Sequence, residues 1–230
     1  QVKPYQRTHD SRPGRSPRTR AKGPDMELGE AIRRRRMVRS FLPDPLERGV
    51  VDRLLEDSLR APSAGNTRGV AWVVLEGPET ARYWDVATDA EWRRSYARYP
   101  NLSRVPVIAL SLCSPTEYVE RYSESDKAGS GLGIGESDDP ATAWPVPYWW
   151  GDAAMSTMLL LLGATAEGLG AAFLGTFRGE QDLLAGLGVP VGWRVFGAVL
   201  LGRPDGQDRP SPSLGRQPRP GASEVHRSRW

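Results

Sequence analysis

The stretch LERGVVDRLLEDSLRAPSAGNTRGVAWVVLEG, residues 46–77, holds a helix, a tight turn and a strand in direct succession. Its first half places Leu and Val three or four residues apart with charges between them, which predicts a helix packed on a core by one face. VAWVVLEG is apolar, rich in β-branched residues and closed by Gly, which predicts a buried strand. The connection APSAGN, residues 61–66, thus brings Pro, Ser, Gly and Asn to the mouth of a strand.

Helices and strands continue to alternate outward from this stretch. The patterns and turn residues predict helices at 26–38, 78–92, 115–125, 152–169 and 180–188 and further strands at 105–113 and 193–204. We interpret the apolar run 158–175 as a buried core helix, because Glu167 and several glycines interrupt it too often for a membrane span. Three or four strands against at least four helices make an α+β domain.

The formal charge of +3 on 230 residues is unevenly distributed. Residues 1–25 carry seven Lys or Arg and two Asp, and residues 209–230 carry five Arg and one Glu, which leaves a net charge of −6 on residues 26–208. The body would not attract a polyanion, so we expect no nucleic-acid partner. A basic interaction module that uses both tails is a weak third hypothesis for the function.

Composition also suggests how the chain divides. Residues 1–25 lack apolar periodicity and are rich in Pro, Arg, Ser and Gly, so we interpret them as a disordered basic leader. Residues 26–230 would form one domain, with a variable, lid-like insertion at 114–150 and an extended C-terminal tail at 205–230. The leader has no apolar segment typical of a secretory signal, so we expect a cytoplasmic protein and no membrane partner.

Side chains for acid–base or metal chemistry are scarce. Cys113 is the single cysteine, and the two histidines, His9 and His226, lie in the tails. We therefore expect no disulfide, no metal site and no histidine-activated Ser63. The glycines of GSGLGIGES, residues 129–137, do not have the spacing of a dinucleotide loop. A bound organic cofactor would then carry the reaction, with no catalytic side chain.

RRRRMVRSF, residues 33–41, is the strongest charge feature of the body, with five Arg in seven positions. It is either a solvated basic helix face or a phosphate-binding cluster. RRRRMVRSF, the stretch 46–77, AMSTMLLLLGATAEGLGAAFLGTF (154–177) and LGVPVGWRVFGAVLLGRP (187–204), in this order, closely resemble the FMN-dependent nitroreductase family. The resemblance covers residues 26–230 and implies an α/β sandwich with a central, mainly antiparallel sheet flanked by helices, in an intertwined homodimer.

The resemblance also implies the residues that bind FMN: Arg35, Arg36, Met37, Arg39, Pro62, Ser63, Ala64, Asn66, Asp152, Leu174, Gly175, Thr176, Arg216 and Arg219. Arg35 and Arg36 would hold the phosphate and ribityl chain, and Arg39 would stabilise the reduced ring. The family often has Ser where Met37 stands and Gln where Asp152 stands. The aromatic residues Trp144, Tyr148 and Trp149 would line a substrate site or, alternatively, pack in the core.

The function implied is that of an oxidoreductase that passes a hydride from NAD(P)H through bound FMN to a planar electrophile, such as a nitroaromatic or a quinone, by a ping-pong mechanism. The alternative is a flavin-binding or storage protein of the same fold with little turnover. The sequence does not distinguish NADH from NADPH or FMN from a deazaflavin.

Overall fold

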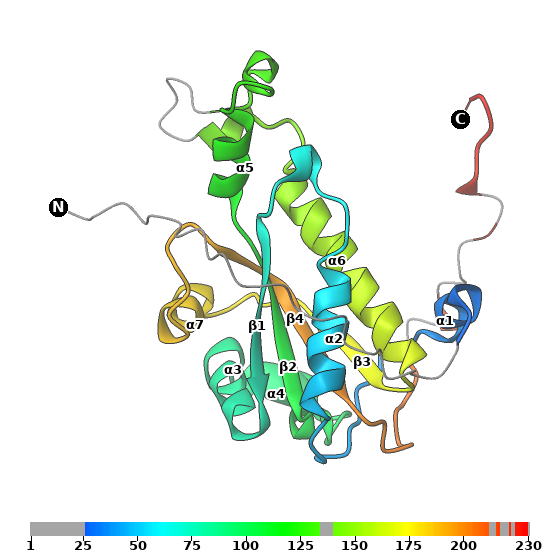
Figure 1. Ribbon diagram of the computed structural model, residues 1–230. Coiled ribbons are helices and arrows are strands. Elements are labelled where there is room, and N and C mark those ends of the chain that lie inside the picture. The colour runs from blue at the N-terminus through cyan, green and yellow to red at the C-terminus, as the bar shows by residue number, and fades with distance from the viewer. Residues whose placement is uncertain (1–25, 134–139, 212–214, 217–220, 222–223, 230) are drawn as a thin grey trace.

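A four-stranded antiparallel sheet forms the centre of the molecule (Figure 1). The computed structural model describes residues 26–133, 140–211, 215–216, 221 and 224–229, so the proposed leader lies outside the described residues. The strands are β1 (Val70–Glu76), β2 (Val107–Cys113), β3 (Gly170–Leu174) and β4 (Arg194–Gly202), in the order β1-β2-β4-β3.

The helices are α1 (Leu28–Arg34), α2 (Arg48–Ser58), α3 (Thr80–Ala87), α4 (Ala90–Ser95), α5 (Pro115–Tyr122), α6 (Tyr148–Ala166) and α7 (Glu180–Gly186). In Figure 1, α2 and α6 lie side by side over one face of the sheet, and α1 lies beside the far end of α6. The helices α3, α4 and α7 lie on the other side. The sheet and its flanking helices confirm the predicted α+β sandwich.

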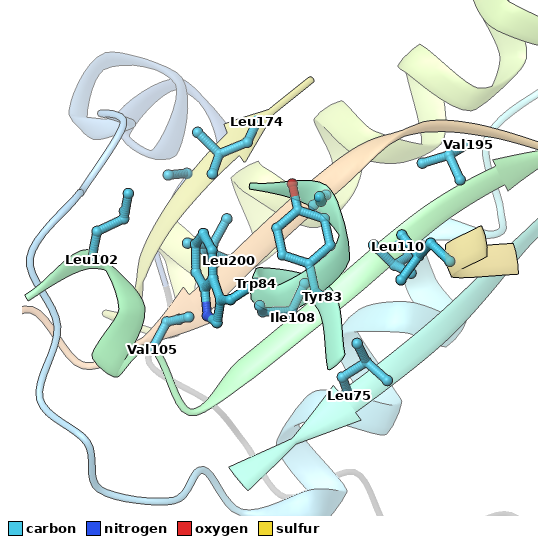
Figure 2. Packing of buried hydrophobic residues seen from close by; sticks show 14 of the residues in the cluster. Leu75, Tyr83, Trp84, Leu102, Val105, Ile108, Leu110, Leu174, Val195 and Leu200 are labelled. Atoms are coloured by element: carbon cyan, nitrogen blue, oxygen red, sulfur yellow. The ribbon is translucent and has the colours of Figure 1, made fainter. Parts of the chain in front are cut away.

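Alternation along the strands explains the two layers of helices. In β2, Val107 and Ala109 pack with α2 and α6, whereas Ile108 and Leu110 pack with α3 and α7. All seven β2 residues are buried, as expected for a central strand covered on both faces. Figure 2 shows the α3 side of this core, where Tyr83 and Trp84 join the cluster around the sheet.

Two predicted helices are divided differently in the structure. Residues 78–92 form two helices, because Asp89 is extended and its side chain accepts a hydrogen bond from Trp92 N at 2.7 Å, which starts a new helix. The interpretation of residues 158–175 as one helix was wrong. The helix α6 ends at Ala166, Gly168 follows with a left-handed φ of 72°, and β3 then forms an edge of the sheet.

The segment 114–150, expected as a lid-like insertion, contributes α5 and buried aromatic residues to a third core cluster around Tyr118 and Cys113. Burial raises the pKa of the Cys113 thiol to about 12, so it stays protonated. Within the described ranges, the helices are all too short or too polar to cross a membrane.

Candidate functional site

The arginine cluster lies at the end of α1, and its members differ in their surroundings. Arg34 is exposed and pairs with Glu30 at 2.9 Å, and Arg36 is exposed. Arg35 follows the last helical residue and is partly buried, and its Nη1 is buried with no hydrogen-bond partner among the described residues. A buried guanidinium nitrogen without an acceptor is costly, and an anionic oxygen bound there would remove that cost. This observation favours the phosphate-binding interpretation over a solvated face.

The strand-like segment after α1 fixes Met37 and Arg39. Met37 forms a parallel bridge with Ala171 of β3, and its sulfur accepts a hydrogen bond from Phe173 N at 3.4 Å. Arg39 lies over the ring of Tyr99, 5.4 Å from its centroid, and donates to the Met37 carbonyl at 3.2 Å. The apolar Met37 side chain thus packs against the sheet, while the Arg39 charge is held by a ring and a carbonyl.

The turn 61–66 is tight and left-handed at its end. Gly65 has a φ of 63° and Asn66 a φ of 56°, which is uncommon for a residue other than Gly. Pro62 and Asn66 are exposed, whereas Ser63 and Ala64 are half-buried. The exposed residues at this turn are therefore available to a ligand, while the backbone between them is held by the protein.

Asp152, in the first half of α6, holds this backbone. Its side chain is buried, and Oδ2 accepts hydrogen bonds from Ala64 N at 2.8 Å and from the Tyr118 hydroxyl at 2.7 Å. Burial and the hydrogen bond to Asp152 both raise the pKa of Tyr118, so the phenol remains a donor. The structure therefore places the Asp152 side chain in the protein interior, where it hydrogen-bonds to the backbone of the turn.

The helix α5 also contacts the turn and holds it in place. These contacts were not predicted from the sequence. Arg121 donates from Nε to the Gly65 carbonyl at 2.9 Å, and both of its terminal nitrogens bind Asp126 at 2.7 Å. The ring of Tyr122 covers Gly65 so closely that a Cβ there would lie 2.6 Å from it. The i, i+3, i+4 spacing of Tyr118, Arg121 and Tyr122 places all three on one helix face, and this was the available signal.

The segment 174–176 follows β3. Leu174 is buried, and Gly175 and Thr176 are half-buried. The Thr176 hydroxyl lies 3.5 Å from the Tyr83 hydroxyl, whose pKa is raised because the ring is buried. Phe177, beside them, is 88% exposed. An exposed aromatic ring thus stands next to one of the predicted cofactor segments.

The three aromatic residues expected at a substrate site divide into two groups. Trp144 and Trp149 are buried and meet Tyr118 edge to face, with centroids 6.1 Å apart in each pair. Tyr148 remains 47% exposed. Burial supports the core-packing interpretation for the two Trp residues and leaves Tyr148 as the one of the three with a substantially exposed ring. In the tail, Arg216 is exposed and Arg219 lies outside the described residues.

A model of the "Nitroreductase family" matches residues 32–203 of this chain. The chain belongs to the nitroreductase family. The match spans the arginine cluster, the 61–66 turn, Asp152 and the 174–176 segment, and it ends before Arg216. The predicted family is therefore confirmed, and the functional assignment of each site residue stays a prediction.

Individual relatives support the same fold. The chain is 28% identical over 188 residues to 5,6-dimethylbenzimidazole synthase of Rhodobacter capsulatus, covering 79% of this chain and 85% of the relative. A nitroreductase family structure from Streptococcus pneumoniae has a TM-score of 0.64 at 18% identity, over 88% of this chain and 100% of its own. A Desulfovibrio desulfuricans structure in complex with FMN has a TM-score of 0.58 at 21% identity, over 90% and 99%.

Proposed function

We propose that this chain is an FMN-dependent oxidoreductase that passes a hydride from NAD(P)H to a planar electrophile such as a nitroaromatic or a quinone. The observation that carries the proposal is the buried Nη1 of Arg35, which has no partner in the described part of the chain and lies next to Arg36 and near Arg39 in sequence. A phosphate matches this cluster, because guanidinium groups bind phosphate oxygens in pairs. The FMN complex of the Desulfovibrio desulfuricans relative supports the choice of cofactor.

The protein would bind and orient the cofactor, which supplies the redox chemistry when bound. Arg35 and Arg36 would hold the phosphate end. Arg39 would place a positive charge at the pyrimidine edge, where reduction builds negative charge. The exposed Pro62 and Asn66 of the turn, and the segment 174–176, would lie beside the ring. Tyr148 and Phe177, both exposed, are available to contact a flat acceptor.

We also infer a homodimer, because α6 is apolar on the side that faces solvent. Met155, Met158 and Leu159 are each at least 40% exposed, and on the neighbouring α1 Leu28 and Ile32 are 65% and 57% exposed. A helix that is apolar around its whole circumference is normally buried. A second copy of the chain would cover this surface, and the turn 62–66 of each copy would lie on the flavin of the other copy.

The test begins with the absorption spectrum and mass of the small molecule that co-purifies with the full chain. We expect FMN, and NADPH oxidation that depends on added menadione or nitrofurazone. Bound flavin without turnover would support the storage alternative and overturn the enzyme. A colourless protein that does not take up added FMN would overturn both.

A further inference from the structure

We propose that Asp152 is a positioning residue, which sets flavin affinity by fixing the 62–66 turn and does not itself contact the flavin. The inference rests on the proposed function, because the turn matters only if FMN binds beside it. It differs from the role that the family resemblance implies for this position, which is direct contact with the cofactor.

The hydrogen bonds of Asp152 join it to other groups of the same chain. The side chain is 2% exposed, and its Oδ2 accepts both the Tyr118 hydroxyl and Ala64 N. No ion pair to Asp152 is found within the described part of the chain. A buried carboxylate without a cation is unfavourable unless its oxygens are hydrogen-bonded. The Tyr118 hydroxyl and Ala64 N therefore determine where the carboxylate lies, and the carboxylate fixes the position of Ala64.

Tyr118 cannot easily move, so it orients the carboxylate. The residue is fully buried. Its ring covers Gly69, where an added Cβ would lie 2.4 Å from the ring, and it packs edge to face against Trp144 and Trp149. A fixed phenol that donates to a fixed carboxylate makes a rigid support behind the turn.

The turn needs such a support because its end is conformationally unfavourable. A non-glycine residue at positive φ, such as Asn66, is in an unfavourable backbone conformation and persists where the surroundings impose it. Two hydrogen bonds hold the turn in this conformation. Ala64 N donates to Asp152, and Arg121 donates to the Gly65 carbonyl. Without Asp152, the turn would sample other conformations and present its exposed Pro62 and Asn66 less often in the binding geometry.

The test is the dissociation constant of FMN for the refolded or stripped apoprotein, measured by flavin fluorescence. We expect about 30-fold weaker binding for Asp152→Ala and about 5-fold weaker binding for Asp152→Asn and for Tyr118→Phe, because each loses part of one buried hydrogen-bond network. Adding Tyr118→Phe to Asp152→Ala should cause no further loss, since the phenol would act only through the carboxylate.

Thr157→Val is the matched control. Thr157 is on the same helix and is buried, and it hydrogen-bonds to Ser111 at 3.2 Å, away from the turn. We expect its FMN affinity to stay within about twofold of the wild type, whatever the loss of thermal stability. If Asp152→Ala does not fold, the FMN affinities of Asp152→Asn and Tyr118→Phe are compared with that of Thr157→Val.

Two results would overturn the proposal. Wild-type affinity in Tyr118→Phe together with weak binding in both Asp152 variants would indicate direct contact with the flavin. Equal weakening in Thr157→Val and Tyr118→Phe would indicate a general effect of core damage.

A second measurement separates this proposal from the proposed function. Hydrogen exchange of the Ala64 amide in the apoprotein should be at least about tenfold faster in Asp152→Asn than in the wild type, because the amide loses its charged acceptor. If wild-type protein binds no FMN, the proposed function fails, and the exchange rate still decides whether Asp152 fixes the turn. Unchanged exchange at Ala64 would refute that role.

Discussion

The two ends of the proposed flavin site are built differently. At the turn end, Ala64 N and the Gly65 carbonyl are both bound by side chains from α6 and α5 of the same chain. At the α1 end, Arg35 Nη1 is buried and has no acceptor among the residues that the structure describes, and apolar side chains of α1 and α6 face solvent. The hydrogen bonds of the turn end are made within a single chain. The α1 end, in contrast, would need a bound anion and a second apolar surface to cover its exposed groups.

This difference separates two kinds of contribution. The turn end is preorganised, so loss of a single hydrogen bond there should change flavin affinity modestly and through geometry, and only loss of the whole Asp152 carboxylate should have a larger effect. The α1 end supplies charge and assembly, so changes there should have larger effects. Three variants test this division, and a fourth, at neither end, gives the reference for a change that should leave flavin binding unaffected.

The largest effect is expected for Met158→Asp. Met158 is 46% exposed in the middle of the apolar face of α6. A carboxylate buried between two copies without a cation should raise the dimer dissociation constant by about 100-fold or more. Sedimentation velocity would detect a monomer, and the flavin content should fall with it. Val191→Asp, at a fully exposed position after α7, is the control. A wild-type monomer, or an undisturbed dimer in Met158→Asp, would contradict the dimer proposal.

The next effect is expected for Arg35→Ala. Loss of the charged phosphate contact should weaken FMN binding by about 10- to 100-fold in a fluorescence titration. The melting temperature of the apoprotein should not fall, because the change removes a buried nitrogen for which the described residues offer no acceptor.

Arg34→Ala is the control for that variant, since Arg34 is exposed and pairs with Glu30. Its flavin affinity should be near that of the wild type. Equal losses in the two variants would show that the cluster acts by its total charge and that Arg35 holds no special position.

A smaller effect is expected for Arg121→Ala, at the preorganised end. Arg121 donates to the Gly65 carbonyl at 2.9 Å, and its loss should weaken FMN binding about three- to fivefold. Arg48→Ala, which removes an exposed arginine paired with Glu76 at 3.3 Å, should leave binding unchanged. An Arg121→Ala effect larger than that of Arg35→Ala would reverse the comparison between the two ends.

The smallest effect is expected for Glu180→Gln, which lies at neither end. Burial would raise the pKa of Glu180, but hydrogen bonds from Arg194 and Val195 N outweigh it, so the pKa is lowered from 4.5. A lowered pKa stabilises the folded state above the unfolded-state pKa, and this contribution is lost as the pH falls through the lowered value. Between pH 6 and about pH 3, the melting temperature should therefore fall more steeply in the wild type than in Glu180→Gln. The two proteins should have equal FMN affinity at pH 7. Parallel pH profiles would contradict this.

Local patterns predicted most of the fold. The spacing of Leu46, Val50, Leu54, Leu55 and Leu59 predicted a helix packed by one face, and the helix α2 forms there. Leu54 and Leu55 are buried as expected, whereas Leu46 and Val50 are partly buried and Leu59 is 50% exposed. The apolar run 105–113 predicted β2. The edge strand β3 was missed, because Ala171 and Ala172 continue the apolar composition of α6 and only the glycines before them mark the break.

The candidate site was less accessible to sequence reasoning. The arginine cluster was evident, but the inward position of Arg35 depends on the residue at which α1 ends. Asp152 and Ala64 are 88 residues apart, and no local pattern joins them. Contacts made by folding distant segments together, such as this pair, could be found only in the structure.

The close packing of Tyr122 on Gly65 and of Tyr118 on Gly69 has a consequence for recombining this chain with relatives. A parent with a β-carbon at position 65 or 69 would collide with these rings, and a parent with a different α5 would leave the glycines uncovered. Crossover points between residues 65 and 122 would therefore separate a glycine from the ring that covers it, whereas crossovers outside that interval keep each pair together.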